Sequence, residues 1–401
     1  MNVLFVGTRK ILGAPQSYTV HVWEVLLGLQ KLGARVTLLD GPFPPADGCI
    51  TRLGGKTGLL RVYRLLPAAL KMVALVAYAM GTIFAVVRRA LAGRCDADVV
   101  YGRHGLLPSE WLMGRLVRIP VVKEVNGLAY VEVGMGTAAI RGWPLRVLAR
   151  LERVSLHRAD RFITVSPELA ECLVLQHGVD RAKVTVIANG ANTELFVMRD
   201  RLDACQHLGM DPEPSYVLFV GALAAWQGVD AFIRCALEVV AQKPNTRFLI
   251  VGDGPERSHL ERLAAETGME NVIRFLGNVA YAVVPWYCAV ADVCVMPKVP
   301  MSTSYSPLKA HEYLACGRPV VATRVPAFHF LEEQHVGRLV DPTDTSEFSQ
   351  AILTLLRDDA LRESMGRRGR DYVVAHASWA SVAAKVDAVL REACRLTGQG
   401  G

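Results

Sequence analysis

The fold is decided by the stretch at residues 304–323, which reads Ser-Tyr-Ser-Pro-Leu-Lys-Ala-His-Glu-Tyr-Leu-Ala-Cys-Gly-Arg-Pro-Val-Val-Ala-Thr. Ser306 is a favoured helix N-cap, and Pro307 suits the first helical position, where its missing N–H is not needed. The next N–H groups, beside Lys309, predict a helix start that binds phosphate. Glu312 lies about 9 Å further along the helix axis, where it could reach a ribose hydroxyl pair. The stretch points to a nucleotide-linked substrate, with an ordinary capped helix as the alternative.

Short apolar runs around this helix predict an alternating sheet. Gly317 suits the left-handed position after a helix, and residues 319–322 follow as a buried strand. Upstream runs that end in turns and precede helix-period sequence lie at residues 216–221, 248–255, 271–279 and 291–297. The C-terminal half therefore predicts a doubly wound α/β sheet. Ligands bind beyond the carboxyl ends of such strands, where the glycine turns fall.

The N-terminal half repeats this rhythm. Strands are expected near residues 3–6, 35–39, 98–101, 121–125 and 161–165. Since residues 1–7 lack a basic start and a cleavage site, they indicate a first strand and not a signal peptide. The turn at residues 7–16 lacks the Gly-x-Gly-x-x-Gly spacing, which argues against a nicotinamide-dependent dehydrogenase.

Composition bounds the class of protein. The 401 residues are 51% hydrophobic, which suits two domains with large cores. The net charge is +7, and its basic excess lies in residues 1–195. This charge suits an anionic membrane or a phosphate-bearing acceptor, whereas no basic and aromatic motif favours nucleic acid. The nine scattered cysteines form no Cys-x-x-Cys pair and indicate a reducing, cytoplasmic compartment.

Residues 65–87 are the most hydrophobic segment, with Lys71 as their only charge. The uninterrupted part is shorter than the roughly 20 residues that a spanning helix needs. The flanking Arg61, Arg64, Arg88 and Arg89 suit a helix that lies among anionic headgroups on the inner face of the membrane. A core helix and a true membrane span are the alternatives.

In this order, the motifs resemble the retaining glycosyltransferases of family 4. The resemblance is densest at residues 163–321 and rests on VSPE (165–168), VIANG (186–190), Gly221 with WQGVD (226–230), GDGP (252–255), FLG (275–277) and SPLKAHE (306–312). It implies two facing Rossmann-like domains of the GT-B type with a cleft between them, and a nucleotide-diphosphate sugar as donor. It also implies that no protein base is needed, because the leaving phosphate can accept the proton of the acceptor. No motif requires a metal, and no cofactor is expected besides the nucleotide-diphosphate sugar as co-substrate.

The resemblance assigns roles to the residues near the glycine turns. The donor diphosphate would lie at residues 306–309, the ribose on Glu312 and the base near Asn278 and Val279. The expected donor-binding residues are Gly221, Ala222, Gln227, Gly252, Gly254, Asn278, Val279, Ser304, Tyr305, Ser306, Pro307, Leu308, Lys309 and Glu312.

Three positions depart from the family pattern. Ser304 replaces the first carboxylate of the Glu-x7-Glu pair. Ala222 and Gln227 stand where the family commonly has an arginine and a lysine directed at the diphosphate. Three basic residues could substitute, namely Lys298, Lys309 and Arg324. These losses keep a non-catalytic protein, either a donor-binding pseudoenzyme or a partner subunit, open as an alternative, and a sugar-nucleotide epimerase is a further one.

The acceptor side is expected in the N-terminal half. Gly13 and Ala14 lie in the first turn, where the family commonly has two glycines, while His104 and Asn126 follow expected strand ends. Asn126 stands where the family often has a histidine or asparagine opposite the sugar. His21 is expected to pack inside a helix without a catalytic role. The residues expected to carry catalysis are Asn126, Lys309 and Glu312.

The sequence thus predicts three segments: an acceptor-side domain at residues 1–192, a nucleotide-sugar domain at 193–370, and helices at 371–401 that return to the first domain. The expected activity is transfer of a hexose-type sugar from a nucleotide diphosphate to a glycan or lipid-linked acceptor, with retained anomeric configuration.

Overall fold

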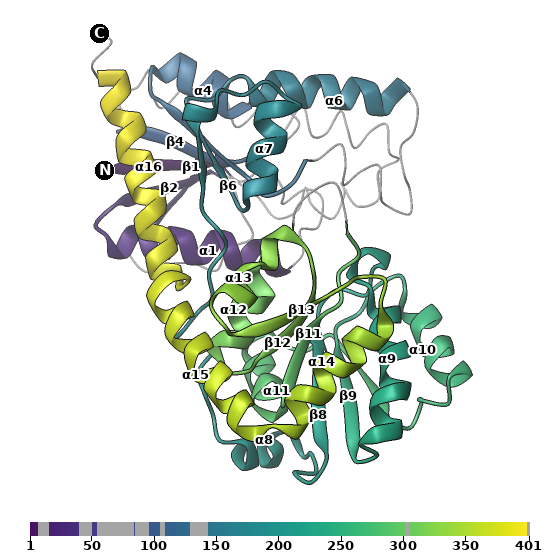
Figure 1. Cartoon of the computed structure of the whole chain (residues 1–401). Coiled ribbons are helices and arrows are strands. Elements are labelled where there is room, and N and C mark those ends of the chain that lie inside the picture. Colours follow the sequence, from purple (N-terminus) through teal and green to yellow (C-terminus); the bar gives the residue numbers. More distant parts are fainter. Residues whose placement is uncertain are drawn as a thin grey trace. The chain divides into compact units, whose positions relative to one another are not determined.

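The structure, a computed structural model, divides the chain into two compact units (Figure 1). Unit 1 comprises Met1–Ala188 and Ala380–Gly401, and unit 2 comprises Asn189–Trp379. The sequence placed these boundaries at 192/193 and 370/371. The residues that the structure describes are 1–6, 16–39, 50–53, 84, 96–104, 109–128, 143–300 and 305–398.

Unit 1 is built on a seven-stranded parallel sheet with strand order β3-β2-β1-β4-β5-β6-β7. Its strands are β1 Asn2–Val6, β2 Arg35–Leu39, β3 Ile50–Leu53, β4 Val99–Arg103, β5 Val121–Val125, β6 Arg161–Thr164 and β7 Val184–Val186. Its described helices are α1 Gln16–Lys31, α4 Ser109–Val117, α6 Trp143–Leu156, α7 Pro167–Leu175 and, from Ala380 on, α16 Trp379–Gly398, with the 3₁₀ turn η2 Arg181–Lys183.

Unit 2 is built on a six-stranded parallel sheet with strand order β10-β9-β8-β11-β12-β13. Its strands are β8 Ser215–Val220, β9 Thr246–Val251, β10 Ile273–Gly277, β11 Val293–Met296, β12 Val320–Thr323 and β13 Gly337–Val340. Its helices are α8 Arg201–Leu208, α9 Val229–Gln242, α10 Arg257–Glu266, α11 Val284–Val290, α12 Leu308–Ala315, α13 Phe330–Glu333, α14 Thr345–Arg357 and α15 Asp359–His376, with 3₁₀ turns η3 Ala225–Gln227, η4 Tyr281–Val283 and η5 Pro326–Phe328.

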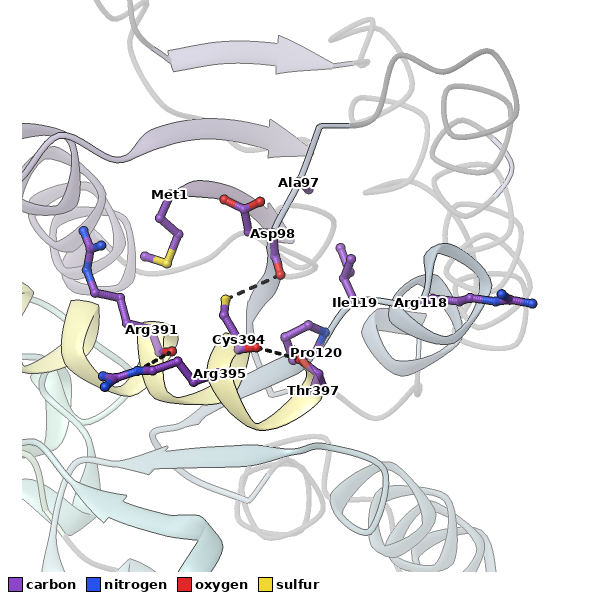
Figure 2. Close-up of a pocket in the computed structure, with 10 residues that line it drawn as sticks. All are labelled: Met1, Ala97, Asp98, Arg118, Ile119, Pro120, Arg391, Cys394, Arg395 and Thr397. Atoms are coloured by element: carbon purple, nitrogen blue, oxygen red, sulfur yellow. Dashed lines mark hydrogen bonds between the residues drawn. The ribbon is translucent and has the colours of Figure 1, made fainter. Parts of the chain in front are cut away.

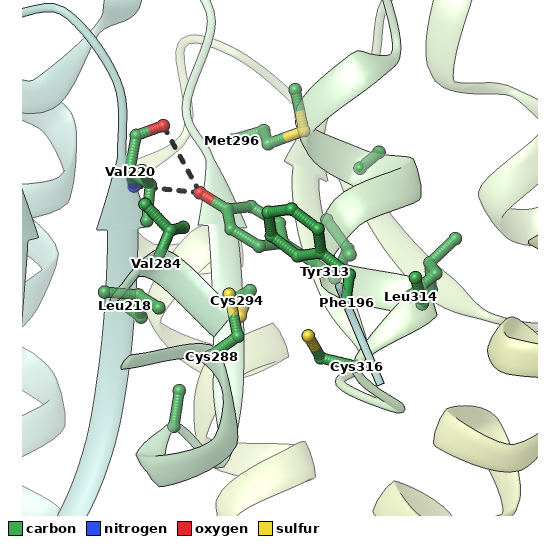
Figure 3. Close-up of a cluster of buried hydrophobic side chains, with 14 of the residues drawn as sticks. Phe196, Leu218, Val220, Val284, Cys288, Cys294, Met296, Tyr313, Leu314 and Cys316 are labelled. Carbon is green, nitrogen blue, oxygen red and sulfur yellow. Dashed lines mark hydrogen bonds between the residues drawn. The ribbon is translucent and has the colours of Figure 1, made fainter. Parts of the chain in front are cut away.

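Each face of the unit 2 sheet carries its own core because successive strand residues point to opposite sides. Leu218 and Val220 pack among residues of α8, α11 and α12, whereas Val217 and Phe219 pack among residues of α9, α10 and α14. Figure 3 shows part of the first cluster, where the Tyr313 hydroxyl accepts a hydrogen bond of 2.8 Å from the Val220 N–H. The helix that holds the expected phosphate site is therefore anchored to the central strand β8.

The expected doubly wound architecture is confirmed for both halves. The sequence did not predict β3 and β13, because each has only four residues and an arginine interrupts its apolar run. The hydrophobic segment at residues 65–87 lies outside the described residues except for Phe84. Among the helices that the structure describes, none is long and apolar enough to cross a membrane.

Candidate functional site

Three glycine turns meet at the carboxyl ends of the unit 2 strands. Gly221 follows β8, Gly252 follows β9, and the Gly252 N–H donates to the carbonyl oxygen of Gly277 at 2.8 Å. A Cβ atom on Gly252, whose φ is +137°, would lie 1.8 Å from the Gly221 carbonyl oxygen. Only glycine allows this approach. The strand order reverses between β8 and β11, and ligands of open α/β sheets bind at such a point.

Gly254 and the two residues expected near the nucleotide base, Asn278 and Val279, lie at the same end of the sheet. A Cβ on Gly254 would lie 2.3 Å from the Leu223 carbonyl oxygen, so this turn also needs glycine. Asn278 is exposed just past β10, and Val279 is half-buried against the core. An exposed amide and a half-buried valine beside a glycine turn give a polar and an apolar surface at this edge.

The start of α12 differs from the sequence prediction by one residue. The helix begins at Leu308, with Pro307 as its cap residue, so the prediction of Ser306 as N-cap was wrong. The Ser306 hydroxyl accepts hydrogen bonds from the Leu308 N–H at 3.3 Å and from the Asn189 side-chain amide at 2.6 Å. Asn189, from the segment after β7, thus fixes the approach to the helix. Ser304 lies outside the described residues.

Glu312 is buried and has hydrogen-bond donors on both carboxylate oxygens. Its Oε2 lies 2.7 Å from the Lys309 ammonium, and its Oε1 accepts a hydrogen bond of 2.9 Å from the Tyr281 hydroxyl. Burial raises the pKa of Glu312, although Lys309 and Tyr281 oppose the rise. Tyr281, which the sequence analysis did not identify, therefore ties the segment after Val279 to α12.

The ammonium group of Lys298 lies beside Gln227, the residue that stands where the family commonly has a lysine. Its ammonium donates to the Gln227 side-chain oxygen and lies 4.6 Å from the centroid of the Trp226 ring and 5.3 Å from that of Tyr305. The side chain is only 7% exposed. Burial, and then the charge of Lys309, lower the pKa of Lys298 to about 7.

The other two candidate substitutes are differently placed. Arg324 pairs with Glu332 at 2.9 Å on the surface, and Lys309 pairs with Glu312. Ala222 is exposed at the end of β8. Of the three candidates, Lys298 is the one that contacts Gln227.

In unit 1, Asn126 and His21 lie together at the carboxyl end of β5. The Asn126 side-chain nitrogen is 3.5 Å from His21 Nδ1, while His21 Nε2 is 3.0 Å from the Glu124 carboxylate. Burial opposes ionisation of Glu124, but the charge and hydrogen bond of His21 outweigh it, and with Arg103 and Tyr101 they lower its pKa to about 2. His21 is thus oriented by a carboxylate next to Asn126, which its place within a helix did not indicate.

His104 is a buried residue with a partner of its own. It follows β4, its N–H donates to the Glu124 carbonyl oxygen at 2.7 Å, and its Nε2 lies 2.8 Å from the Glu152 carboxylate. This pairing holds the imidazole in the core of unit 1. Gly13 and Ala14 lie outside the described residues.

Unit 1 also has a surface pocket of about 730 Å³ (Figure 2). It lies at the amino-terminal ends of the strands, between Met1, Asp98, Pro120 and the last turns of α16. Ligands of parallel sheets bind at the opposite, carboxyl ends, so this pocket is a poor candidate for the site. Within the described ranges, no group of three or more His, Cys, Asp or Glu side chains is arranged to hold a metal ion.

Comparison with known proteins gives matches over both units. The family model described as "Glycosyltransferase Family 4" matches residues 19–195, and that described as "Glycosyl transferases group 1" matches residues 214–358. A D-inositol 3-phosphate glycosyltransferase from Nocardia farcinica is 31% identical over 312 residues, which are 72% of this chain and 67% of that protein. D-inositol 3-phosphate glycosyltransferase 2 from Catenulispora acidiphila is 30% identical over 287 residues, 68% of this chain. The chain spans 65% of the length of the Catenulispora protein.

The fold also matches a solved structure. The crystal structure of HepE from Anabaena in complex with UDP superposes with a TM-score of 0.72 at 18% sequence identity, covering 98% of this chain and 100% of that chain. At this identity the likeness establishes the fold.

Proposed function

Because the chain belongs to glycosyltransferase family 4 and has the GT-B fold, we propose that it transfers a hexose-type sugar from a nucleotide-diphosphate donor to an acceptor with retention of anomeric configuration. The observation that carries the proposal is the arrangement around α12. Its start lies in the connection that leaves β11, which neighbours β8 where the strand order reverses, and Glu312, one turn inside, is buried against Lys309 and Tyr281. A helix start, a cation and a carboxylate at this spacing suit a diphosphate followed by a ribose.

The protein's part in this reaction is positioning and charge stabilisation. Negative charge grows on the diphosphate as the sugar leaves, so cations held in place before the reaction favour the transition state over the ground state. The leaving phosphate takes the proton of the acceptor hydroxyl, and no cofactor is required. Asn126, supported by His21 and Glu124, is proposed to face the sugar or the acceptor.

The acceptor is proposed to be a glycan or a lipid-linked molecule. The relatives named D-inositol 3-phosphate glycosyltransferases add an inositol phosphate to the acceptors worth testing. A phosphate-bearing acceptor agrees with the basic excess of residues 1–195.

The test combines binding with turnover. Calorimetry with UDP, GDP and ADP should identify one nucleoside diphosphate that binds the wild type, as UDP does in the HepE structure. Mass spectrometry with the matching sugar nucleotides and the acceptors above should then detect transfer, and the anomeric coupling constant of the product should match that of the donor. Absence of binding to every nucleotide would refute the proposal, whereas tight binding without turnover would favour a non-catalytic protein.

Glu312→Ala tests the ribose assignment. Hydroxyls left without their charged partner should weaken nucleotide binding by about 1 to 3 kcal/mol. Glu266→Ala is the matched control, since Glu266 is exposed on α10. Equal affinities of Glu312→Ala and wild type would rule out contact between Glu312 and the ribose.

We also propose peripheral contact with an anionic membrane through residues 61–89, most of which lie outside the described residues. The hydrophobic run and its arginine flanks support this contact. Replacing Arg88 and Arg89 with glutamate should reduce co-sedimentation with phosphatidylglycerol liposomes, at about 1 kcal/mol per charge. The proposal would be contradicted if the wild-type protein did not co-sediment with these liposomes at low salt.

A further inference from the structure

We propose that Lys298 is a diphosphate-binding residue, which supplies from the end of β11 the cation that the chain lacks at Gln227. The inference rests on the proposed function, because it names a residue for the donor site of that reaction. Its basis is a buried ammonium group that has neutral partners and belongs to a residue just beyond β11, which pairs with β8 where the strand order reverses.

The backbone places Lys298 at the centre of the carboxyl edge. It lies two residues beyond β11, which neighbours β8. Its carbonyl oxygen accepts a hydrogen bond of 2.7 Å from the Thr323 hydroxyl at the end of β12. The η3 turn packs directly on the preceding peptide, because a Cβ on Gly228 would lie 1.7 Å from the Pro297 carbonyl oxygen. Three segments therefore fix the lysine backbone beside the expected diphosphate.

The side chain of Lys298 is enclosed but its charge is not neutralised. It contacts the Gln227 amide oxygen and the faces of the Trp226 and Tyr305 rings, all of which are uncharged. In the part of the chain that the structure describes, no carboxylate forms an ion pair with it. A buried ammonium without a counter-charge is unfavourable, and an anion bound beside it would compensate its charge.

A second cation nearby indicates a ligand with more than one negative charge. The charge of Lys309 reaches Lys298 strongly enough to lower its pKa. Glu312 pairs with Lys309, whereas no carboxylate among the described residues pairs with Lys298, so one of the two ammonium groups has no ion-pair partner there. A diphosphate restores the balance, and lysine binds phosphate as a compact point charge.

Lys298→Met tests this assignment, because methionine keeps the apolar contacts and removes the charge. At pH 7, calorimetry with inorganic pyrophosphate and with UDP should show affinity reduced more than tenfold, or about 1.4 kcal/mol. Uridine carries no phosphate, so its affinity for the variant should stay within about twofold of its affinity for wild type, well below the tenfold loss expected for pyrophosphate and UDP. Lys298→Gln is the second variant and should behave in the same way.

Two further variants separate charge from packing. Lys243→Met is the matched control. The half-buried Lys243 follows α9 and donates a hydrogen bond to the Leu356 carbonyl oxygen of α14, so its loss should not change the pyrophosphate affinity. Adding Gln227→Lys to Lys298→Met returns a cation to the same place and should recover most of the affinity. A folded Lys298→Met that binds pyrophosphate as tightly as wild type would overturn the assignment and leave the proposed function standing. Wild type that binds neither UDP, GDP, ADP nor pyrophosphate would overturn both.

Discussion

Lys298→Met should stabilise the protein, and the stabilisation should depend on pH. The pKa of Lys298 is lowered from 10.5 to about 7 by its burial and by Lys309. At 1.36 kcal/mol per pKa unit, this corresponds to about 5 kcal/mol of unfavourable free energy for the charged form in the folded protein. The group is 7% exposed, so solvent screening reduces this figure little.

The sign follows from proton binding. Between pH 7 and pH 10.5 the unfolded chain keeps the lysine proton that the folded protein has lost, so the lysine's destabilising effect declines as pH rises. Lys298→Met removes this titration. The gain in unfolding free energy over wild type should be largest below pH 7. It should shrink by about 3 kcal/mol between pH 6 and pH 9, because each pH unit above pH 7 changes it by about one factor of ten in the unfolding equilibrium.

The measurement is urea unfolding of the full chain at pH 6 and pH 9, with the survival of unit 2 followed by pulse proteolysis and mass spectrometry. Thr323→Val is the control. It loses the hydrogen bond to the Lys298 carbonyl oxygen but no titrating group, so its destabilisation should be equal at both pH values. An unchanged difference between Lys298→Met and wild type at pH 6 and pH 9 would show that the lysine is neutralised or solvated, and would refute the reasoning.

Two other variants test the framework of the site. Gly228→Ala should lower the free energy of unfolding by at least about 2 kcal/mol, because the glycine has φ +67° and the added Cβ would collide with the Pro297 carbonyl oxygen. It should also weaken pyrophosphate binding, because that carbonyl group directly precedes Lys298. Urea unfolding and calorimetry would check both effects, and wild-type behaviour would mean that the η3 turn does not fix Lys298. Tyr281→Phe should cost about 1 kcal/mol of stability and weaken UDP binding a few-fold, because Glu312 loses one of its two donors. Equal UDP affinity in calorimetry would separate Tyr281 from nucleotide binding.

The sequence predicts much of the fold because parallel strands buried on both faces are continuous apolar runs. β2 and β5 begin and end at the expected residues, and Gly317 has the expected left-handed conformation, with φ +69°. β13 was missed because Arg338 is exposed in the middle of four residues, so that its apolar pattern is too short to distinguish it from a loop. The apolar pattern of a sequence locates a strand only when the strand is long enough for the pattern to be recognised.

The site is less predictable because its contacts join distant segments. Asn189 and Ser306 are 117 residues apart, and Lys298 and Gln227 are 71 residues apart. Spacing along one helix could suggest Glu312, yet it could not show that Tyr281 binds the same carboxylate. The sequence could name Lys298 only as one of three candidate cations, because a lysine after a strand is usually a solvated surface residue and nothing local shows that its side chain is buried beside Gln227.

The placement of Lys298 changes the argument about catalysis. The substitutions at Ala222 and Gln227 remove two positive charges from the expected diphosphate site, and on sequence alone this keeps open the alternative of a protein that binds without reacting. The structure brings a lysine to the side chain of Gln227. A cation buried before the ligand arrives is worth more than a solvated one, because the low dielectric around it strengthens its attraction to the charge that develops on the leaving diphosphate. One buried lysine beside Lys309 can therefore offset more of the lost charge than a count of basic residues indicates, and the geometry favours an active transferase.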